Sequence, residues 1–141
     1  MEKLRTWLSR QGFELRVDGR HDYVDYASLT VHVSPRQSVR QRLHSALHEC
    51  GHVAVLRSRA TRRRTPYAGA TLRRWATNRR RNRTDRLLVL EEEIEAWRRG
   101  EALGRRLGIR LASAKVRDAH RSRCLCTYLK WTLKPSLLAR A

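Results

Sequence analysis

The sequence predicts an α+β domain in which a small antiparallel or mixed sheet packs on a helical body. Strand-like alternation of apolar and polar residues is confined to residues 13–33, and helical periodicity precedes and follows it. With 141 residues and 40% hydrophobic residues, the chain can bury one modest core. We therefore expect a single domain over residues 1–141.

The N-terminal part of the chain is predicted to contain one helix and three strands. Residues 1–12 predict an amphipathic helix that ends at a glycine. Residues 13–26 predict a hairpin, with Asp18 and Gly19 as its two-residue turn. Residues 28–33 predict a third strand. Three apolar side chains of this strand are expected to alternate toward the core: Leu29, Val31 and Val33.

Three helices are predicted in the remainder of the chain. The first ends near Leu56 and is capped by Ser34 or Ser38, since each has a glutamine three residues later. The second lies within residues 86–109, and the third covers about residues 112–133. Their predicted apolar positions are Leu87, Leu90, Ile94 and Trp97 on the second helix, and Val116, Ala119, Leu125, Tyr128 and Leu129 on the third.

The chain is strongly basic, with a formal net charge of +19, and 28 of its 32 basic residues are arginine. Residues 57–86 hold twelve arginines and one acid, and we interpret them as a basic insertion between two helices. Such charge attracts DNA, RNA or acidic proteins. The alternative is that codon usage favours arginine and the side chains are simply solvated. The predicted contacts are Arg62, Arg63, Arg64, Arg73, Arg74, Arg79, Arg80, Arg81 and Arg83.

Neither a membrane segment nor a disulfide framework is predicted. No apolar run approaches the length that spans a bilayer, and the N-terminus lacks the apolar stretch of a secretory signal. We therefore expect a cytoplasmic protein, associated with nucleic acid through its arginines, with no membrane partner. Cys50, Cys124 and Cys126 have no framework spacing, and we expect them to be thiols.

Residues 43–56, LHSALHECGHVAVL, contain the motif HExxH. His48 and His52 are four residues apart, so on a helix both imidazoles can reach one Zn²⁺. Glu49 is rotated away from the ligands and can accept a proton from a metal-bound water. Residues 43–56 contain no arginine, although the chain is rich in it, and this indicates that the helix is buried. The alternative is that ordinary hydrogen bonds satisfy the two histidines.

A hydrolytic zinc site needs a third protein ligand. On a helical wheel of residues 87–104, Glu93 lies in the inward arc beside two glycines and an alanine, which suits close approach to the motif helix. Glu93 is the predicted third ligand, Glu101 is the second choice, and His120 is a further candidate. The remaining glutamates are expected to face away: Glu91 and Glu95 on the polar flank, and Glu92 outward near Arg99. The alternative is that Glu93 only pairs with a local arginine.

His44 lies one turn before His48 on the same helix face. It is a candidate to hydrogen-bond a metal ligand or to face the cleft. A solvated surface histidine is the alternative for both His44 and His120.

The segments LHECGHV and EEEIEAW resemble the HExxH-plus-glutamate metallopeptidases, the gluzincins. The nearest resemblance is to minimal ImmA/IrrE-like and small phage- or prophage-encoded peptidases, over residues 28–104. It implies a minimal zincin fold and a third ligand in an E-x-x-A context, which matches Glu93 and Ala96. Many members carry Asp or Asn where this chain has Trp97. We therefore expect the hydrogen bond that such a residue would give to the site to be missing here, and Trp97 itself to lie beside the ligands or the cleft. Four residues are candidates for stabilising an oxyanion: Tyr26, Tyr67, His120 and Tyr128.

These features predict a zinc-dependent peptidase in which Glu49 activates a zinc-bound water to cleave a protein or peptide substrate. We expect the strand over residues 29–33 to pair with an extended substrate. The alternative is a nucleic-acid-binding protein with a structural or vestigial zinc site. A third reading is a peptidase homologue that binds a partner without cutting it.

Overall fold

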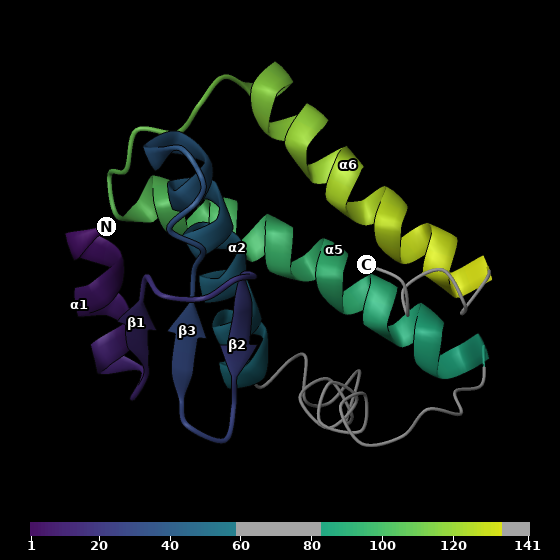
Figure 1. Cartoon of the computed structure of the whole chain (residues 1–141), viewed down its shortest axis with the longest axis horizontal. Coiled ribbons are helices and arrows are strands. Elements are labelled where there is room, and N and C mark those ends of the chain that lie inside the picture. The colour runs from purple at the N-terminus through teal and green to yellow at the C-terminus, as the bar shows by residue number, and fades with distance from the viewer. Residues whose placement is uncertain (59–82, 134–141) are drawn as a thin grey trace.

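The computed structural model describes residues 1–58 and 83–133, and it confirms the predicted α+β class. Four helices and three strands lie in these residues (Figure 1). In chain order they are α1 (Glu2–Arg10), β1 (Glu14–Arg16), β2 (Tyr23–Asp25), β3 (Thr30–His32), α2 (Val39–Arg57), α5 (Arg83–Arg106) and α6 (Ala114–Leu133).

The sheet is mixed, with the strand order β1-β3-β2. β1 runs parallel to β3, with Leu15 opposite Val31, and β2 runs antiparallel to β3, with Val24 opposite Val31. The predicted hairpin over residues 13–26 is therefore wrong, because β3 separates β1 from β2. Burial explains the order: β3 is the most buried of the three strands, so it takes the central position.

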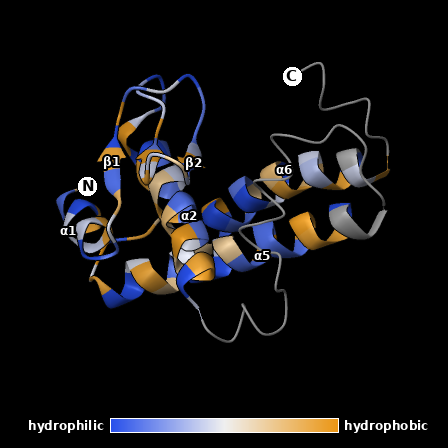
Figure 2. Cartoon of the chain, turned by 90° about the horizontal axis from the view of Figure 1, so that it is seen from below, coloured by the Kyte–Doolittle hydropathy of each residue, from blue (hydrophilic) through white to orange (hydrophobic). Residues whose placement is uncertain are grey.

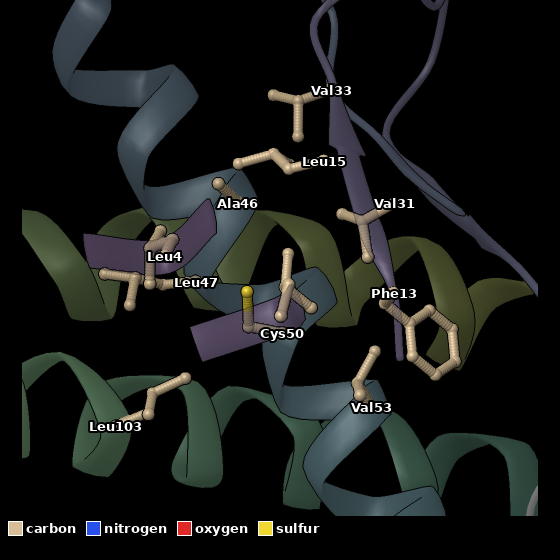
Figure 3. Close-up of a cluster of buried hydrophobic side chains, with 11 residues drawn as sticks. Leu4, Phe13, Leu15, Val31, Val33, Ala46, Leu47, Cys50, Val53 and Leu103 are labelled. Atoms are coloured by element: carbon tan, nitrogen blue, oxygen red, sulfur yellow. The ribbon is translucent and has the colours of Figure 1, made fainter. Parts of the chain in front are cut away.

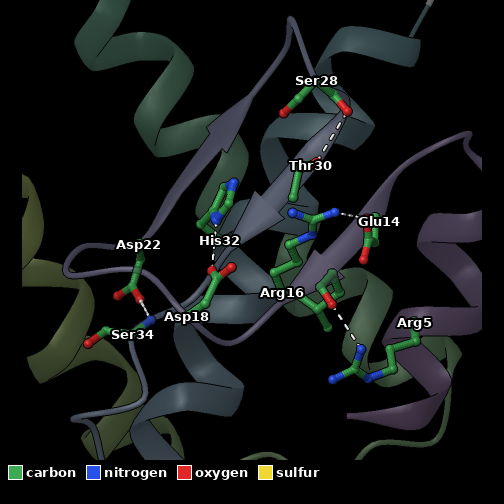
Figure 4. Close-up of polar contacts among 10 residues, drawn as sticks. Arg5, Glu14, Arg16, Asp18, Asp22, Ser28, Thr30, His32 and Ser34 are labelled. Carbon is green, nitrogen blue, oxygen red and sulfur yellow. Dashed lines mark hydrogen bonds and ion pairs between the residues drawn. The ribbon is translucent and has the colours of Figure 1, made fainter.

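The turn between β2 and β3 is built by Asp25. Its carboxylate accepts the backbone N–H groups of Ala27 and Ser28, an arrangement in which the side chain imitates a backbone turn. Leu29 follows with a φ of 52° and is 43% exposed, so its predicted inward position is wrong. Figure 4 shows further polar contacts around the sheet, including His32 with Asp18 at 2.8 Å. Val31 and Val33 are fully buried, as predicted.

The hydrophobic core lies where α1, the sheet and α2 meet (Figure 3). The predicted amphipathic helix at the N-terminus is confirmed, since Leu4 and Leu8 of α1 are fully buried. Gly12 adopts a φ of 75° just after this helix, a left-handed conformation that glycine adopts without steric cost. The core residues labelled in the figure are Leu4, Phe13, Leu15, Val31, Val33, Ala46, Leu47, Cys50, Val53 and Leu103.

Helix α2 begins with a complete capping box. Ser38 accepts the backbone N–H of Gln41, and the Gln41 side chain accepts the backbone N–H of Ser38. Of the two predicted caps, Ser38 is therefore the one used. One turn further on, Ser45 donates to Gln37, which in turn donates to Asp22 at 2.5 Å. This chain of bonds ties the segment before β2 to the first half of α2.

Helices α2 and α5 touch through their backbones. A Cβ atom added at Gly51 would overlap the carbonyl oxygen of Ala96, and one added at Gly100 would overlap the carbonyl oxygen of Leu47. Ala96 and Gly100, which were predicted to lie in the inward arc of this helix, therefore do face α2. This contact sets the rotation of α5 about its axis and turns Glu93 toward α2.

The outer positions of α5 and α6 differ from the prediction. Leu87 is 56% exposed and Ile94 is 49% exposed, because the backbone contact with α2 buries Val89 and Ala96 instead. On α6, Val116 and Leu129 are likewise exposed. Figure 2 shows hydrophobic and hydrophilic residues alternating along both helices.

The predicted basic insertion lies mostly outside the described residues. Arg57 ends α2, and Arg83 is the first residue of α5. The other predicted polyanion contacts fall within residues 59–82 and are not described. Within the described residues, no helix has both the length and the apolar character needed to cross a membrane.

The backbone contact between α2 and α5 can be tested with two glycines that lie one turn apart on α5. We expect Gly100→Ala to lower the free energy of unfolding by about 1–3 kcal/mol, because the new methyl group meets rigid backbone. Gly104→Ala is the matched control. Its methyl group would meet the flexible Leu111 side chain at 2.9 Å, and the gain in helix propensity of about 1 kcal/mol offsets this contact. Equal urea denaturation midpoints for the two variants would contradict the contact.

Candidate metal centre

Three predicted ligands converge between α2 and α5. His48 and His52 project from successive turns of α2, and their Nε2 atoms lie 3.3 Å apart. Glu93 reaches across from α5, with one carboxylate oxygen 3.1 Å from His48 Nε2 and the other 3.4 Å from His52 Nε2. The predicted ligand set is therefore brought together by two helices.

These separations are short enough for the three side chains to share one metal ion. Ions such as Zn²⁺ bind His and carboxylate ligands at about 2.0–2.2 Å, so two atoms that share the ion lie at most about 4 Å apart. The two Nε2 atoms lie 3.3 Å apart, and the Glu93 contacts of 3.1 and 3.4 Å, which involve different carboxylate oxygens, also fall within this limit. Among the described residues, this is the one group of three His, Cys, Asp or Glu side chains close enough to hold a metal ion.

The ionisable side chains at this site shift one another's pKa values. Burial lowers the pKa of His48, outweighing the opposite effect of Glu93. Burial also acts to lower the pKa of His52, but the carboxylates of Glu93 and Glu92 raise it well above its usual value. The two histidines in turn hold the pKa of Glu93 below its usual range despite burial. The raised pKa favours a proton on His52, so a metal that binds this imidazole competes with that proton.

Glu49 is buried beside the ligands on α2, at 5% exposure. Burial raises the pKa of Glu49 to about 8, with His52 acting in the opposite direction. A carboxylate in such surroundings is a stronger base than one in water. Its role as proton acceptor stays a prediction.

Glu92 also faces the site, which corrects the prediction that it points outward near Arg99. It is 7% exposed, and its Oε1 lies 3.4 Å from His52 Nδ1. The helical wheel placed Glu92 outside the inward arc, but the close approach of α5 to α2 buries its side chain as well. The sequence signal was the run of three adjacent glutamates, of which two can face one partner helix.

Trp97 and His44 lie on the His48 side of the site. The Trp97 ring stacks on the His48 ring, with centroids 4.2 Å apart and planes 17° apart. His44 is buried, so the alternative of a solvated histidine is wrong for this residue. Its ring lies 6.2 Å from that of His120 on α6. His44, His48 and Trp97 together line a pocket, as expected for residues beside a cleft.

Glu101, the second choice for the third ligand, does not reach the other ligands. It also lines the pocket, but its carboxylate lies 3.6 Å from Arg117 and 3.8 Å from Arg121, both on α6. His120 is half-buried against Trp97, with ring centroids 5.5 Å apart. Glu93 is therefore the third member of the cluster.

Helix α6 brings two further side chains toward Glu93. Burial raises the pKa of Tyr128, and the tyrosine hydroxyl also interacts with the Glu93 carboxylate. Tyr128 therefore lies near Glu93, while Tyr67, another oxyanion candidate, is outside the described residues. Burial raises the pKa of Cys124 as well, with a smaller effect of Glu93. All three cysteines are free, as predicted.

A metal analysis tests the ligand set. We expect the purified protein to bind one Zn²⁺ per chain, and Glu93→Ala to lose it, because two histidines alone leave the site open. Glu101→Ala is the control and should retain the metal. Because the proton on His52 competes with zinc, the affinity should fall as the pH is lowered. Equal zinc content in the two variants would rule out Glu93 as a ligand.

Comparison with known proteins gives no match for this chain. The chain matches no protein-family model, no curated protein and no solved structure. Any functional assignment therefore rests on the geometry and chemistry of the residues themselves.

Proposed function

We propose that this protein is a zinc-dependent peptidase that acts on a protein or peptide substrate in the cytoplasm. The observation that carries the proposal is the convergence of His48, His52 and Glu93, whose ligand atoms lie close enough together to hold one metal ion. Three protein ligands leave the fourth position open for chemistry, as in hydrolytic zinc sites. The gluzincin resemblance of the two motif segments supports the same reaction class.

Zn²⁺, when bound by His48, His52 and Glu93, supplies Lewis-acid chemistry that makes water nucleophilic at neutral pH and polarises a carbonyl group. Glu49 accepts the proton of the attacking water, since its buried carboxylate lies beside the ligands and its pKa is raised to about 8. The same carboxyl then donates that proton to the leaving nitrogen. Trp97 and His44 line a small pocket beside His48, and we propose that the substrate approaches the site from this side.

An extended substrate cannot pair with residues 29–33, because β3 is the central strand with neighbours on both sides. β2 is an edge strand of this sheet, and α1 packs beside the other edge strand, β1. Asp22, immediately before β2, lies near enough to Glu49 and His48 to affect their pKa values. We therefore propose that substrate backbone adds to the β2 edge and runs toward the metal site.

Glu49→Gln separates catalysis from metal binding. We expect peptidase activity toward a quenched fluorescent peptide library to fall by about 10²–10⁴-fold, because the amide cannot accept the proton. Zinc content should stay at the wild-type level, because Glu49 is not a ligand. Glu95→Gln is the control, since Glu95 only pairs with Arg98 and Arg99 on the same helix. Full activity in the Glu49→Gln variant would overturn the proposed mechanism.

A second candidate function, of a different class, is nucleic-acid binding with the metal as a structural element. The observation that favours it is the net charge of +19 on 141 residues. In that case the metal would hold α2 and α5 together, and the basic residues would carry the function.

Salt dependence after metal removal distinguishes this second function. A nucleic-acid-binding protein should retain affinity for a DNA or RNA duplex after chelation, provided that it stays folded. This affinity should fall by about 10³–10⁵-fold between 50 and 200 mM salt if six to ten phosphates are contacted. The measurement is a fluorescence anisotropy titration, with circular dichroism as the folding control. Absence of binding at 50 mM salt would exclude this function.

A further inference from the structure

We infer that Glu92 is a positioning residue for the metal centre: it holds the His52 ring by its Nδ1 atom so that Nε2 faces the metal. The inference rests on the proposed zinc site and adds a residue to it. The helical wheel predicted that Glu92 faces away from the site, and the resemblance to the gluzincins gives it no role.

The geometry places His52 between two adjacent carboxylates. Glu93 Oε1 lies 3.4 Å from His52 Nε2, and Glu92 Oε1 lies 3.4 Å from His52 Nδ1. The two ring nitrogens point to opposite sides of the imidazole, and residues 92 and 93 are rotated by about 100° on α5. One short run of sequence thus provides a metal ligand at one nitrogen and a hydrogen-bond acceptor at the other.

A neutral imidazole carries one proton, on either Nδ1 or Nε2. Metal binding through Nε2 requires that the proton sit on Nδ1, and a buried N–H needs an acceptor. His52 is 5% exposed, so water is a poor substitute. Glu92 supplies that acceptor, which selects the tautomer competent for metal binding.

The surroundings of Glu92 favour this role over a structural ion pair. In a chain with 32 basic residues, no Lys or Arg of the described part pairs with the Glu92 carboxylate; its ion-pair partner there is His52. Its second oxygen is buried without a hydrogen bond among the described residues. A buried carboxylate without an arginine or lysine partner is costly, and the Nδ1–H of a metal-bound His52 imidazole would offer the compensating partner.

The two histidines are held in different ways. His48 Nδ1 has no hydrogen-bond partner among the described residues, and its ring is held by stacking on Trp97. The Asp or Asn that many similar peptidases carry at this position is thus replaced by an aromatic contact. The carboxylate partner comes instead from the residue before the ligand, and it serves His52.

The test is a zinc-affinity measurement by competition with a chromophoric chelator on three full-length variants. Glu92→Leu keeps the buried volume but removes the acceptor, and we expect its zinc affinity to fall roughly 10–100-fold. Glu92→Gln keeps a carbonyl acceptor, so its loss should be smaller than that of the leucine variant. Glu91→Leu, at the exposed neighbouring position, is the control and should bind zinc like the wild type.

A second readout reports the tautomer directly. In zinc-loaded wild type, ¹H–¹⁵N NMR of the histidine rings should show a His52 Nδ1 proton protected from exchange with water. That protection should be lost in Glu92→Leu and kept in Glu91→Leu, with circular dichroism confirming that both variants fold.

The outcomes separate this inference from the proposed function. Wild-type zinc affinity and a protected Nδ1 proton in Glu92→Leu would overturn the role of Glu92 while leaving the zinc site intact. Failure of the wild type to bind zinc would overturn both. Because the readouts do not depend on cleavage, a protein that binds zinc but cuts no peptide would still support the role of Glu92.

Discussion

The backbone contact between α2 and α5 is the constraint on which the metal centre depends. Gly51 meets Ala96, and Gly100 meets Leu47, with no room for a Cβ atom at either glycine. At this distance glutamate side chains on α5 reach the imidazoles of α2 from both sides. A helix pair separated by ordinary side chains would stand 8–10 Å apart between axes, and the carboxylates would fall short.

The centre also gathers negative charge in a basic protein. Glu49, Glu92 and Glu93 are buried around two histidines, and within the described residues no Arg or Lys forms an ion pair with them. Burying three carboxylates without an arginine or lysine partner is unfavourable, and protonation or a divalent metal relieves the cost. Burial raises the pKa of Glu49, and the neighbouring carboxylates raise the pKa of His52 despite burial, so both groups hold protons more readily than in water. Within the described residues, arginines pair with Glu95 and Glu101 of the same helix and not with these three carboxylates.

The three members of the cluster could be predicted from the sequence, but the side chains around them could not all be predicted. His48 and His52 follow from helical spacing, and Glu93 follows from the small residues around it, because both patterns are local. Glu92 was placed outward because a helical wheel ranks faces and does not show how closely two helices approach. The hairpin prediction failed for a similar reason: turn chemistry at Asp18 and Gly19 is local, whereas the central place of β3 depends on long-range burial.

The strand order has a consequence for how the chain folds. β2 and β3 are joined by a short turn, so this pair closes between neighbours in sequence, on the microsecond scale typical of hairpins. β1 precedes both, yet it pairs in parallel with β3, so this pairing closes a longer loop of the chain than the β2–β3 turn does and costs more loop-closure entropy.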